Sequence, residues 1–131
     1  MAKIKTRQYS DIDLNFIEHP LTGDISKKYD AVAIGQALKN IIQYRLFEKP
    51  FDPDLHTSIR DLLFEPFSPR VSILIEKYTV EIIEKYEKRI QVLKTEVIAS
   101  PTDQSYTLKL TYRPLNSAEP VTVDLYLTRV R

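Results

Sequence analysis

The stretch EKYEKRIQVLKTEVIAS, residues 84–100, begins with the spacing of a charged helix and ends with that of a strand. Apolar residues before it recur at helical spacing, whereas from Arg89 onward apolar and polar residues begin to alternate. Three charged residues, 87–89, occupy the joint between the two patterns. This change of period predicts a helical part over residues 30–89 followed by an antiparallel sheet over residues 90–131.

Two long helices and one short helix are expected in the helical part. Asp30 is a suitable N-cap for AVAIGQALKNIIQYRLF, and Ser68 followed by Pro69 is an N-cap with proline at the first helical position. Between them, TSIRDLLFEP predicts a short helix that Pro66 stops. The apolar stripes expected to face the core are Ala31, Ile34, Leu38, Ile41 and Ile42 in the first long helix, and Val71, Ile75, Tyr78, Ile82 and Tyr86 in the second.

Three strands are expected after the joint. Apolar and polar residues alternate in SYTLKLTYR (105–113) and VTVDLYLTRV (121–130), so each strand has one apolar face. IQVLKTEVIA (90–99) is rich in β-forming residues, and short polar connectors separate the three segments. They predict an antiparallel meander whose apolar face the two long helices cover. The predicted fold class is α+β, in a single domain (1–131) that begins with an extended arm (1–29).

An open edge follows from this topology. A three-stranded sheet has two edge strands, and an edge strand offers unpaired main-chain groups to another chain. Pro114 and Pro120 fall outside the strand cores, where they do not block pairing. The sequence therefore predicts an edge that is available to a partner.

Composition excludes several functional classes. Nineteen Lys and Arg stand against eighteen Asp and Glu, so we expect neither nucleic acid nor an anionic membrane as a partner. The chain has no cysteine, and His19 and His56 are too few to suggest a metal site. Gly23 and Gly35 are the only glycines, so no Gly-rich phosphate loop is present and no cofactor is predicted. No apolar run approaches the ~18 residues of a spanning helix, so we expect a soluble protein made in a cytoplasm.

Four motifs carry a resemblance to a known family. They are YSDID at 9–13, KPFDPDL at 49–55, DLLFEPFSP at 61–69 and YEKRI at 86–90. In this order and at these intervals the chain resembles the baseplate wedge family of contractile phage tails, which includes the related baseplate subunit of type VI secretion systems. The family typically has Glu-Pro-Arg in the fourth motif, so the likeness carries over to Glu87 and Arg89, with Lys88 in place of the proline. His56 stands where the family tends to have glycine.

The resemblance implies a structural role and no catalytic residue. It implies a subunit of the inner ring of a sixfold virion tail baseplate, assembled in the bacterial cytoplasm, which holds other wedge subunits and templates the first ring of tail sheath protein. Family members resemble the interlocking domain of the sheath subunit, in which chains add strands to one another's sheets. We therefore expect strand 121–127 to be the edge that receives an arm of the sheath protein. The residues assigned to partner contacts are Glu87, Arg89, Tyr9, Asp11, Val121, Val123, Leu125 and Leu127.

The charges at the joint also have a purely structural explanation, since charged pairs at i,i+4 and cations near a helix C-terminus stabilise a helix end. We expect the Glu87 carboxylate and the Arg89 guanidinium to project on different sides, so that one holds the turn while the other reaches a neighbouring subunit. Arg89 could instead pair with Glu65 or Glu87 inside the fold. For Tyr9 and Asp11 in the arm, docking on a partner and simple surface packing remain open alternatives.

Three phenylalanines lie around the central loop and the short helix. Such an aromatic group is usually core packing, and we interpret it so rather than as a ligand pocket. Its members are Phe51, Phe64 and Phe67.

Two other functional classes compete with the structural role. A cell-wall muramidase is one, because the resembling family has carried a lysozyme-like label. Glycoside hydrolysis needs two carboxylates across a cleft, one with its pKa raised by an apolar pocket. Glu65 is the best candidate for that acid, with Asp52 or Asp54 as its partner. The other is an adaptor that binds one peptide strand and differs from a baseplate subunit in not entering a sixfold assembly.

Overall fold

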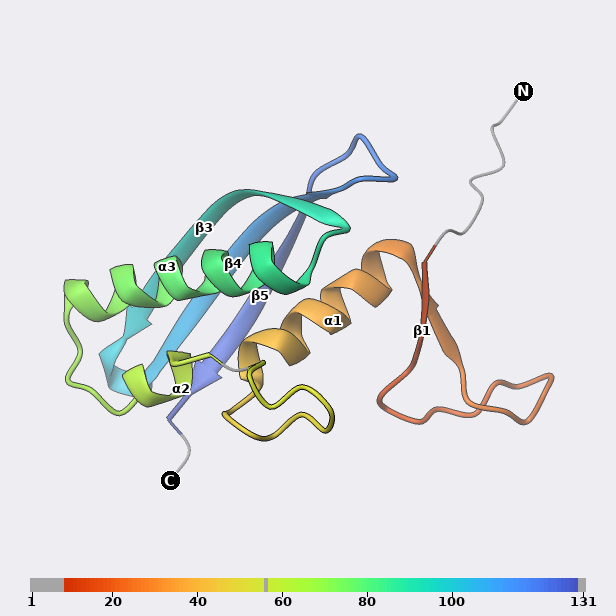
Figure 1. The fold of residues 1–131 in the computed structure, drawn as a ribbon, viewed down its shortest axis with the longest axis horizontal. Helices are drawn as coiled ribbons and strands as arrows, with labels where there is room; N and C mark the ends of the chain where they lie inside the picture. The colour runs from red at the N-terminus through yellow and green to blue at the C-terminus, as the bar shows by residue number, and fades with distance from the viewer. Residues whose placement is uncertain (1–8, 56, 130–131) are drawn as a thin grey trace. The chain divides into compact units, whose positions relative to one another are not determined.

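The computed structural model of the chain describes residues 9–55 and 57–129 (Figure 1). The chain divides into two compact units, Met1–Ala37 and Leu38–Arg131, and the boundary falls inside helix α1 (Asp30–Gln43). A single domain over residues 1–131 remains a prediction. Within the described ranges, no helix is long and apolar enough to cross a membrane.

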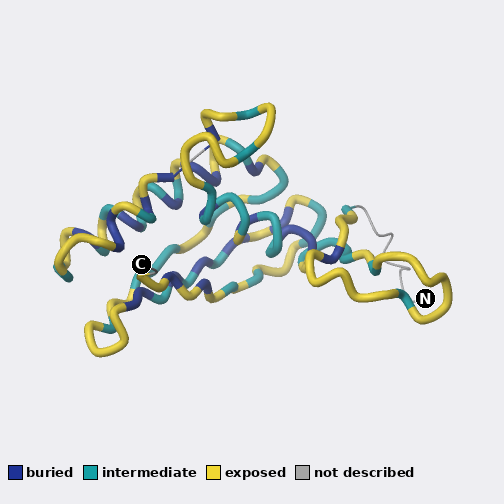
Figure 2. The backbone as a smooth tube through the Cα atoms, turned by 90° about the horizontal axis from the view of Figure 1, so that it is seen from below, coloured by how far each residue is buried: buried dark blue, intermediate teal, exposed yellow. Residues whose placement is uncertain are grey.

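The first unit contains a two-stranded antiparallel sheet of β1 (Ser10–Ile12) and β2 (Lys27–Tyr29). An isolated bridge between Glu18 and Ile25 extends the pairing toward the turn. The segment predicted as an extended arm therefore folds back on itself as a hairpin, most of which is exposed (Figure 2). Strands of three residues are too short to show an alternation in the sequence, so the period gave no signal here.

The second unit is built on the predicted meander. Its strands β3 (Ile90–Ser100), β4 (Ser105–Pro114) and β5 (Val121–Thr128) are antiparallel and lie in the order β3-β4-β5 (Figure 1). A short 3-10 turn, η1 (Pro101–Asp103), joins the first two strands. The central strand supplies much of the core, because its alternate residues Tyr106, Leu108, Leu110 and Tyr112 are buried. The predicted alternation in this strand is confirmed.

Helix α3 (Pro69–Tyr86) packs against β3 and also contacts the short helix α2 (Ile59–Leu62). It begins as predicted, because the Ser68 hydroxyl accepts a hydrogen bond from the Val71 amide at 3.3 Å. The residues that α3 buries are Val71, Ile75, Thr79, Ile82 and Ile83.

This buried stripe of α3 differs from the predicted one, since Thr79 and Ile83 take the places given to Tyr78 and Tyr86. The two tyrosines are only half-buried. A threonine is tolerated in the core because its hydroxyl donates to the Ile75 carbonyl at 2.7 Å.

The first helix and the aromatic group also differ in part from the predictions. Helix α1 ends at Gln43, and its buried residues are Ala33, Ile34, Leu38 and Ile42. Of the three phenylalanines expected in the core, Phe51 is fully exposed and Phe64 is exposed. Phe67 stacks on Tyr106 with ring centroids 4.9 Å apart. The backbone at Phe51 has a φ of 67°, a left-handed turn that carries the ring outward into solvent.

Candidate functional site

The strand order leaves two edges of the sheet, one at β3 and one at β5. The position of β5 at an edge agrees with the prediction for strand 121–127. Which main-chain groups point out of each edge depends on the register of the ladders, because alternate residues of an edge strand bond inward and face outward.

Two hydrogen bonds beyond the strand ends fix the direction of the main-chain groups. The Arg129 amide donates to the Gln104 carbonyl at 3.5 Å, one residue beyond the pair Ser105 and Thr128. Odd-numbered residues of β5 therefore bond to even-numbered residues of β4. On the other side of β4, the Leu115 amide donates to the Arg89 carbonyl at 2.9 Å, which turns the odd-numbered residues of β4 toward β3. Both bonds thus give the same alternation in β4, with its even-numbered residues bonded to β5 and its odd-numbered residues bonded to β3.

The outward-facing residues of β5 are its polar ones. Their side chains are exposed and, within residues 9–55 and 57–129, no hydrogen bond is made to their main-chain amides. These residues are Thr122, Asp124, Tyr126 and Thr128.

The residues that the sequence analysis assigned to the edge face inward instead. Val121, Val123, Leu125 and Leu127 bond to β4, and their side chains lie on the core-facing side, where the last two are each only 5% exposed. The alternation in the sequence shows which residues share a direction. It does not show which set the neighbouring strand uses, because that depends on the register.

The edge at β3 is obstructed at one position. Beyond the irregularity between Val92 and Lys94, the amide of Val97 faces away from β4 and donates to the Glu76 carboxylate of α3 at 3.0 Å. A helix side chain bonded to an outward amide hinders the pairing of another strand at that position. In β5, by contrast, no outward amide has a partner among the described residues, so β5 is the more open of the two edges.

The open edge ends beside two small pockets within the second unit. One, of about 60 Å³, is lined by residues of α1, of α2 with the residue that follows it, and of β5: Ile42, Gln43, Ile59, Arg60, Leu63, Tyr126, Leu127 and Thr128. The other is lined by Arg45, Arg60, Leu63, Phe64 and Thr128. The Thr57 hydroxyl donates to the Ile42 carbonyl at 2.9 Å and ties the loop after α1 to the end of that helix.

Glu87 and Arg89 pair with each other at the joint. Nε and Nη2 of Arg89 donate to the two carboxylate oxygens of Glu87 at 2.7 and 2.6 Å, and the Arg89 amide donates to Oε1 at 3.2 Å. Glu87 is 6% exposed, whereas the side chain of Arg89 is 34% exposed. The prediction that the two side chains project on different sides is wrong, because the backbone leaves the helix at Glu87 and brings them together. Glu87 is also the internal partner of Arg89 that the sequence analysis had offered beside Glu65.

The electrostatics of this pair keep Glu87 ionised. Burial alone raises the pKa of its carboxyl, but the hydrogen bonds and the charge of Arg89 outweigh burial and bring the pKa below its ordinary value. The nearby Tyr112 is affected in the opposite way, since burial first and then the Glu87 charge raise the pKa of its phenol. The joint is thus a buried ion pair that holds the end of α3 near the start of β3.

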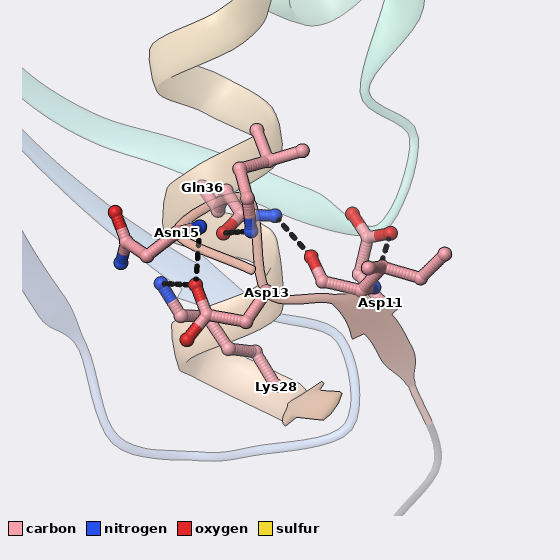
Figure 3. A network of polar contacts seen from close by, with 7 residues as sticks. Asp11, Asp13, Asn15, Lys28 and Gln36 are labelled. Atoms are coloured by element: carbon pink, nitrogen blue, oxygen red, sulfur yellow. Dashed lines mark hydrogen bonds and ion pairs between the residues drawn. The ribbon is translucent and has the colours of Figure 1, made fainter. Parts of the chain in front are cut away.

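A polar network organises the hairpin of the first unit (Figure 3). Asp13 is buried, and its Oδ1 accepts from the Asn15 amide at 2.9 Å and from Lys28 Nζ at 3.1 Å. These two partners, the Asn15 amide first, lower the pKa of the Asp13 carboxyl. Gln36 of α1 donates to the Ile12 carbonyl at 2.8 Å. The sequence analysis missed Asp13, although Asp is a residue whose side chain commonly accepts from the amide two residues on in such a turn.

The two predicted contact residues of the arm lie beside this network. The Asp11 side chain is exposed and its Oδ1 accepts from the Ile12 amide at 2.8 Å. Tyr9 is half-buried, its carbonyl accepts from the Asp30 amide at 2.8 Å, and its amide donates to Asp30 Oδ1 at 3.1 Å. Tyr9 and Asp11 thus lie on either side of Ser10, at the start of β1.

Comparison with known proteins identifies the family. No family model matches the chain. The baseplate wedge protein gp25 of Enterobacteria phage T4 is 33% identical to it over 108 residues, which cover 82% of this chain and 79% of that protein. The chain belongs to the gp25 baseplate wedge family. The resemblance carried by the four motifs is confirmed.

A solved structure shares the fold of this gp25 family member. A crystal structure described as a tail lysozyme from Geobacter sulfurreducens matches it with a TM-score of 0.67, over 75% of this chain and 89% of that one. The two sequences are 18% identical, so the likeness concerns the fold alone.

The residues offered for a muramidase lack the setting that such chemistry needs. Glu65 is exposed, so no apolar pocket encloses its carboxyl. Asp52 is 3.9 Å from Lys49 Nζ in a partly exposed ion pair, and Asp54 is exposed. In the part of the chain that the structure describes, no group of three or more His, Asp or Glu side chains could hold a metal ion.

Proposed function

We propose that this gp25 family member is a structural baseplate subunit of a contractile phage tail or a related machine, and that it receives an arm of the sheath protein as a fourth strand beside β5. The observation that supports strand addition is the open edge, where the outward amides of Thr122, Asp124, Tyr126 and Thr128 have no partner among the described residues. The relationship to the T4 wedge protein supports the baseplate setting.

Strand addition suits a template because its affinity comes from main-chain hydrogen bonds and makes little demand on sequence. Each such bond contributes roughly 0.5–1.5 kcal/mol net, and ordering the arm costs part of this gain. A single subunit would therefore bind the arm weakly. Copies held in a sixfold ring raise the effective concentration of edges, so the ring nucleates sheath although one copy does not.

The contacts with other wedge subunits fall to the first unit and to Arg89 in this proposal. Tyr9 and Asp11 belong to a hairpin region that exposes a group of apolar side chains to solvent: Ile12, Leu14, Phe16, Ile17 and Leu21. Exposed apolar residues clustered on so short a segment are typical of a protein interface. Glu87 is buried, so the part of the joint that a neighbour could touch is Arg89.

A single proline substitution in β5 tests strand addition. Asp124→Pro removes an outward amide and leaves the bonds between β5 and β4 in place, because edge strands accept proline where the N–H faces solvent. We expect the variant to keep its circular dichroism spectrum and to lose sheath binding in co-sedimentation with purified sheath protein. Asp124→Ala is the matched control, since it removes the same side chain and keeps the amide. A folded Asp124→Pro variant that still seeds sheath in negative-stain micrographs would contradict the proposal.

Assembly in the bacterial cytoplasm into the virion tail baseplate is part of the same proposal, with other wedge subunits and sheath protein as partners and neither nucleic acid nor membrane. A free peptide-binding adaptor would use the same edge but would stay outside a sixfold particle. Co-expression with the adjacent wedge and sheath proteins separates the two, because only the baseplate subunit should be recovered in rings. Purified chain that clears peptidoglycan would favour the muramidase instead.

A further inference from the structure

Three arginines gather where the open edge of β5 ends. Arg45 and Arg60 line the pocket that contains Phe64 and Thr128. Arg129 joins them through Phe64, because its Nη2 donates to the Phe64 carbonyl at 3.2 Å and its guanidinium lies 5.3 Å from the centroid of the Phe64 ring.

None of the three forms an ion pair with a carboxylate of residues 9–55 or 57–129. This holds although Asp61 and Glu65 are close to Arg60 along the chain. The whole protein carries nearly balanced charges, with nineteen Lys and Arg and eighteen Asp and Glu. The Glu48 carboxylate is nearby and accepts the main-chain amide of Arg45 at 2.7 Å, but within the described ranges none of the three guanidinium groups is engaged in an ion pair.

A small pocket of mixed character adjoins the end of the edge. The pocket of about 60 Å³ is lined by Gln43 and Arg60 together with Ile42, Ile59 and Leu63 on the helical side, and by Tyr126, Leu127 and Thr128 of β5. Arg60 thus lines both this pocket and the one that contains Arg45. A strand that pairs with the outward groups of β5 passes Asp124 and Tyr126 and reaches these two pockets at Thr128.

We propose that this end of β5 is a carboxylate-binding site for the added strand. Arg45 and Arg60, which line the pocket at Thr128, bind a carboxylate of the incoming segment. A guanidinium matches a carboxylate because its planar fork donates two parallel hydrogen bonds. The proposal rests on strand addition at β5 and specifies the chemistry of the segment that binds there.

The carboxylate can come from an acidic side chain or from the C-terminus of the incoming chain. A terminal carboxylate at this place requires the added strand to run parallel to β5, because its last residue then lies beside Thr128. An acidic side chain is compatible with either direction. A nucleic-acid phosphate would also suit three arginines, but it would leave the outward amides of the edge without a role.

The test compares two charge-matched variants of the full chain in binding to purified sheath protein. Arg45→Gln with Arg60→Gln removes the two arginines of the pocket, and Arg70→Gln with Lys39→Gln removes two exposed positive charges of the same unit elsewhere. Loss of a charge-assisted bidentate contact is expected to weaken binding at least about tenfold. The control pair should change it by less than about twofold, and both variants should melt like the wild type.

Peptides then distinguish the source of the carboxylate. Hydrogen exchange identifies the sheath segment that becomes protected on binding, and that segment is synthesised with a free C-terminus, with an amidated C-terminus, and with its acidic residues replaced by glutamine. Weaker binding after amidation identifies the terminus, and weaker binding after the glutamine exchange identifies a side chain. Equal binding of all three peptides overturns the carboxylate site.

The outcomes separate this proposal from strand addition itself. If Asp124→Pro abolishes sheath binding while Arg45→Gln with Arg60→Gln leaves it unchanged, the carboxylate site is overturned and strand addition stands. If the wild type binds no sheath protein, both fail. If the arginine variant instead loses binding to a short single-stranded RNA and keeps the sheath peptide, the site is a phosphate site and the proposal is wrong.

Discussion

The amide of Val97 in β3 donates a hydrogen bond to the carboxylate of Glu76 in α3 at 3.0 Å. Through this contact, a carboxylate of α3 occupies one main-chain donor on the edge opposite to β5. The edge at β3 is therefore obstructed at Val97, whereas the outward amides of β5 have no partner among the described residues.

Glu76→Ala should open the edge at β3. The Val97 amide then loses its acceptor, and we expect the free energy of unfolding to fall by about 1 kcal/mol. Urea unfolding measures the loss, and light scattering after gel filtration measures self-association through the freed edge. Glu76→Gln keeps an acceptor oxygen and is the control. Equal stability of the alanine variant and the wild type would show that the contact does not hold the edge.

Arg89→Ala should destabilise the joint more strongly. The variant leaves the buried Glu87 carboxylate without its two side-chain donors, at a cost of about 2–3 kcal/mol in the free energy of unfolding. Lys39→Ala, at an exposed position of α1, should change it by less than about 0.5 kcal/mol. If both variants unfold alike in urea, Glu87 and Arg89 are not a structural pair. Normal wedge assembly by a folded Arg89→Lys variant would further count against a role of the guanidinium in subunit contacts.

The same pair should make stability depend on acid. The pKa of Glu87 is lower in the folded chain than in the unfolded one, so its contribution is present above about pH 4.5 and is lost as the pH falls through the lowered pKa. We expect the urea midpoint of the wild type to fall across this window. Glu87→Gln should be less stable at neutral pH and should show a shallower decline. Parallel curves for the two proteins would assign the acid dependence to other carboxyls, among them Asp13.

Phe51→Gly should stabilise the chain. Phe51 has a φ of 67° and a fully exposed side chain, so the ring contributes no burial while the backbone occupies a conformation that favours glycine. We expect a gain of about 1 kcal/mol over Phe51→Ala, which removes the ring and keeps the Cβ atom. Thermal melting of the three proteins measures the difference. A glycine variant that melts below the alanine variant would show that the left-handed turn carries no strain.

Features set by nearby residues were predictable from the sequence. The start of α3 was predictable because Ser68 and Pro69 determine it locally. The apolar face of β4 was predictable because its residues alternate over the whole strand. The hairpin of the first unit was not predictable, since strands of three residues are too short to show an alternation of apolar and polar residues. The outward position of Phe51 was not predictable either, since it depends on a left-handed backbone turn within the loop.

The candidate site was predictable only in outline. The sequence indicated the right strand as the edge, but the register with β4 decided which of its residues face outward. The pairing of Glu87 with Arg89 depends on the backbone angles where α3 ends, and helical spacing says nothing about that turn. The arginines beside Phe64 come from a loop, a helix and the end of a strand, so no motif brings them together before the chain folds.

Asp124 near the middle of the open edge has a consequence for free subunits before assembly. If two copies met edge to edge in antiparallel fashion about this residue, their Asp124 carboxylates would lie opposite each other, and like charges directly opposite across strands are destabilising. A foreign strand without an acidic residue at that position meets no such repulsion. One negative charge on an otherwise uncharged edge therefore makes the subunit a poor partner for itself and keeps the edge vacant until a different protein arrives.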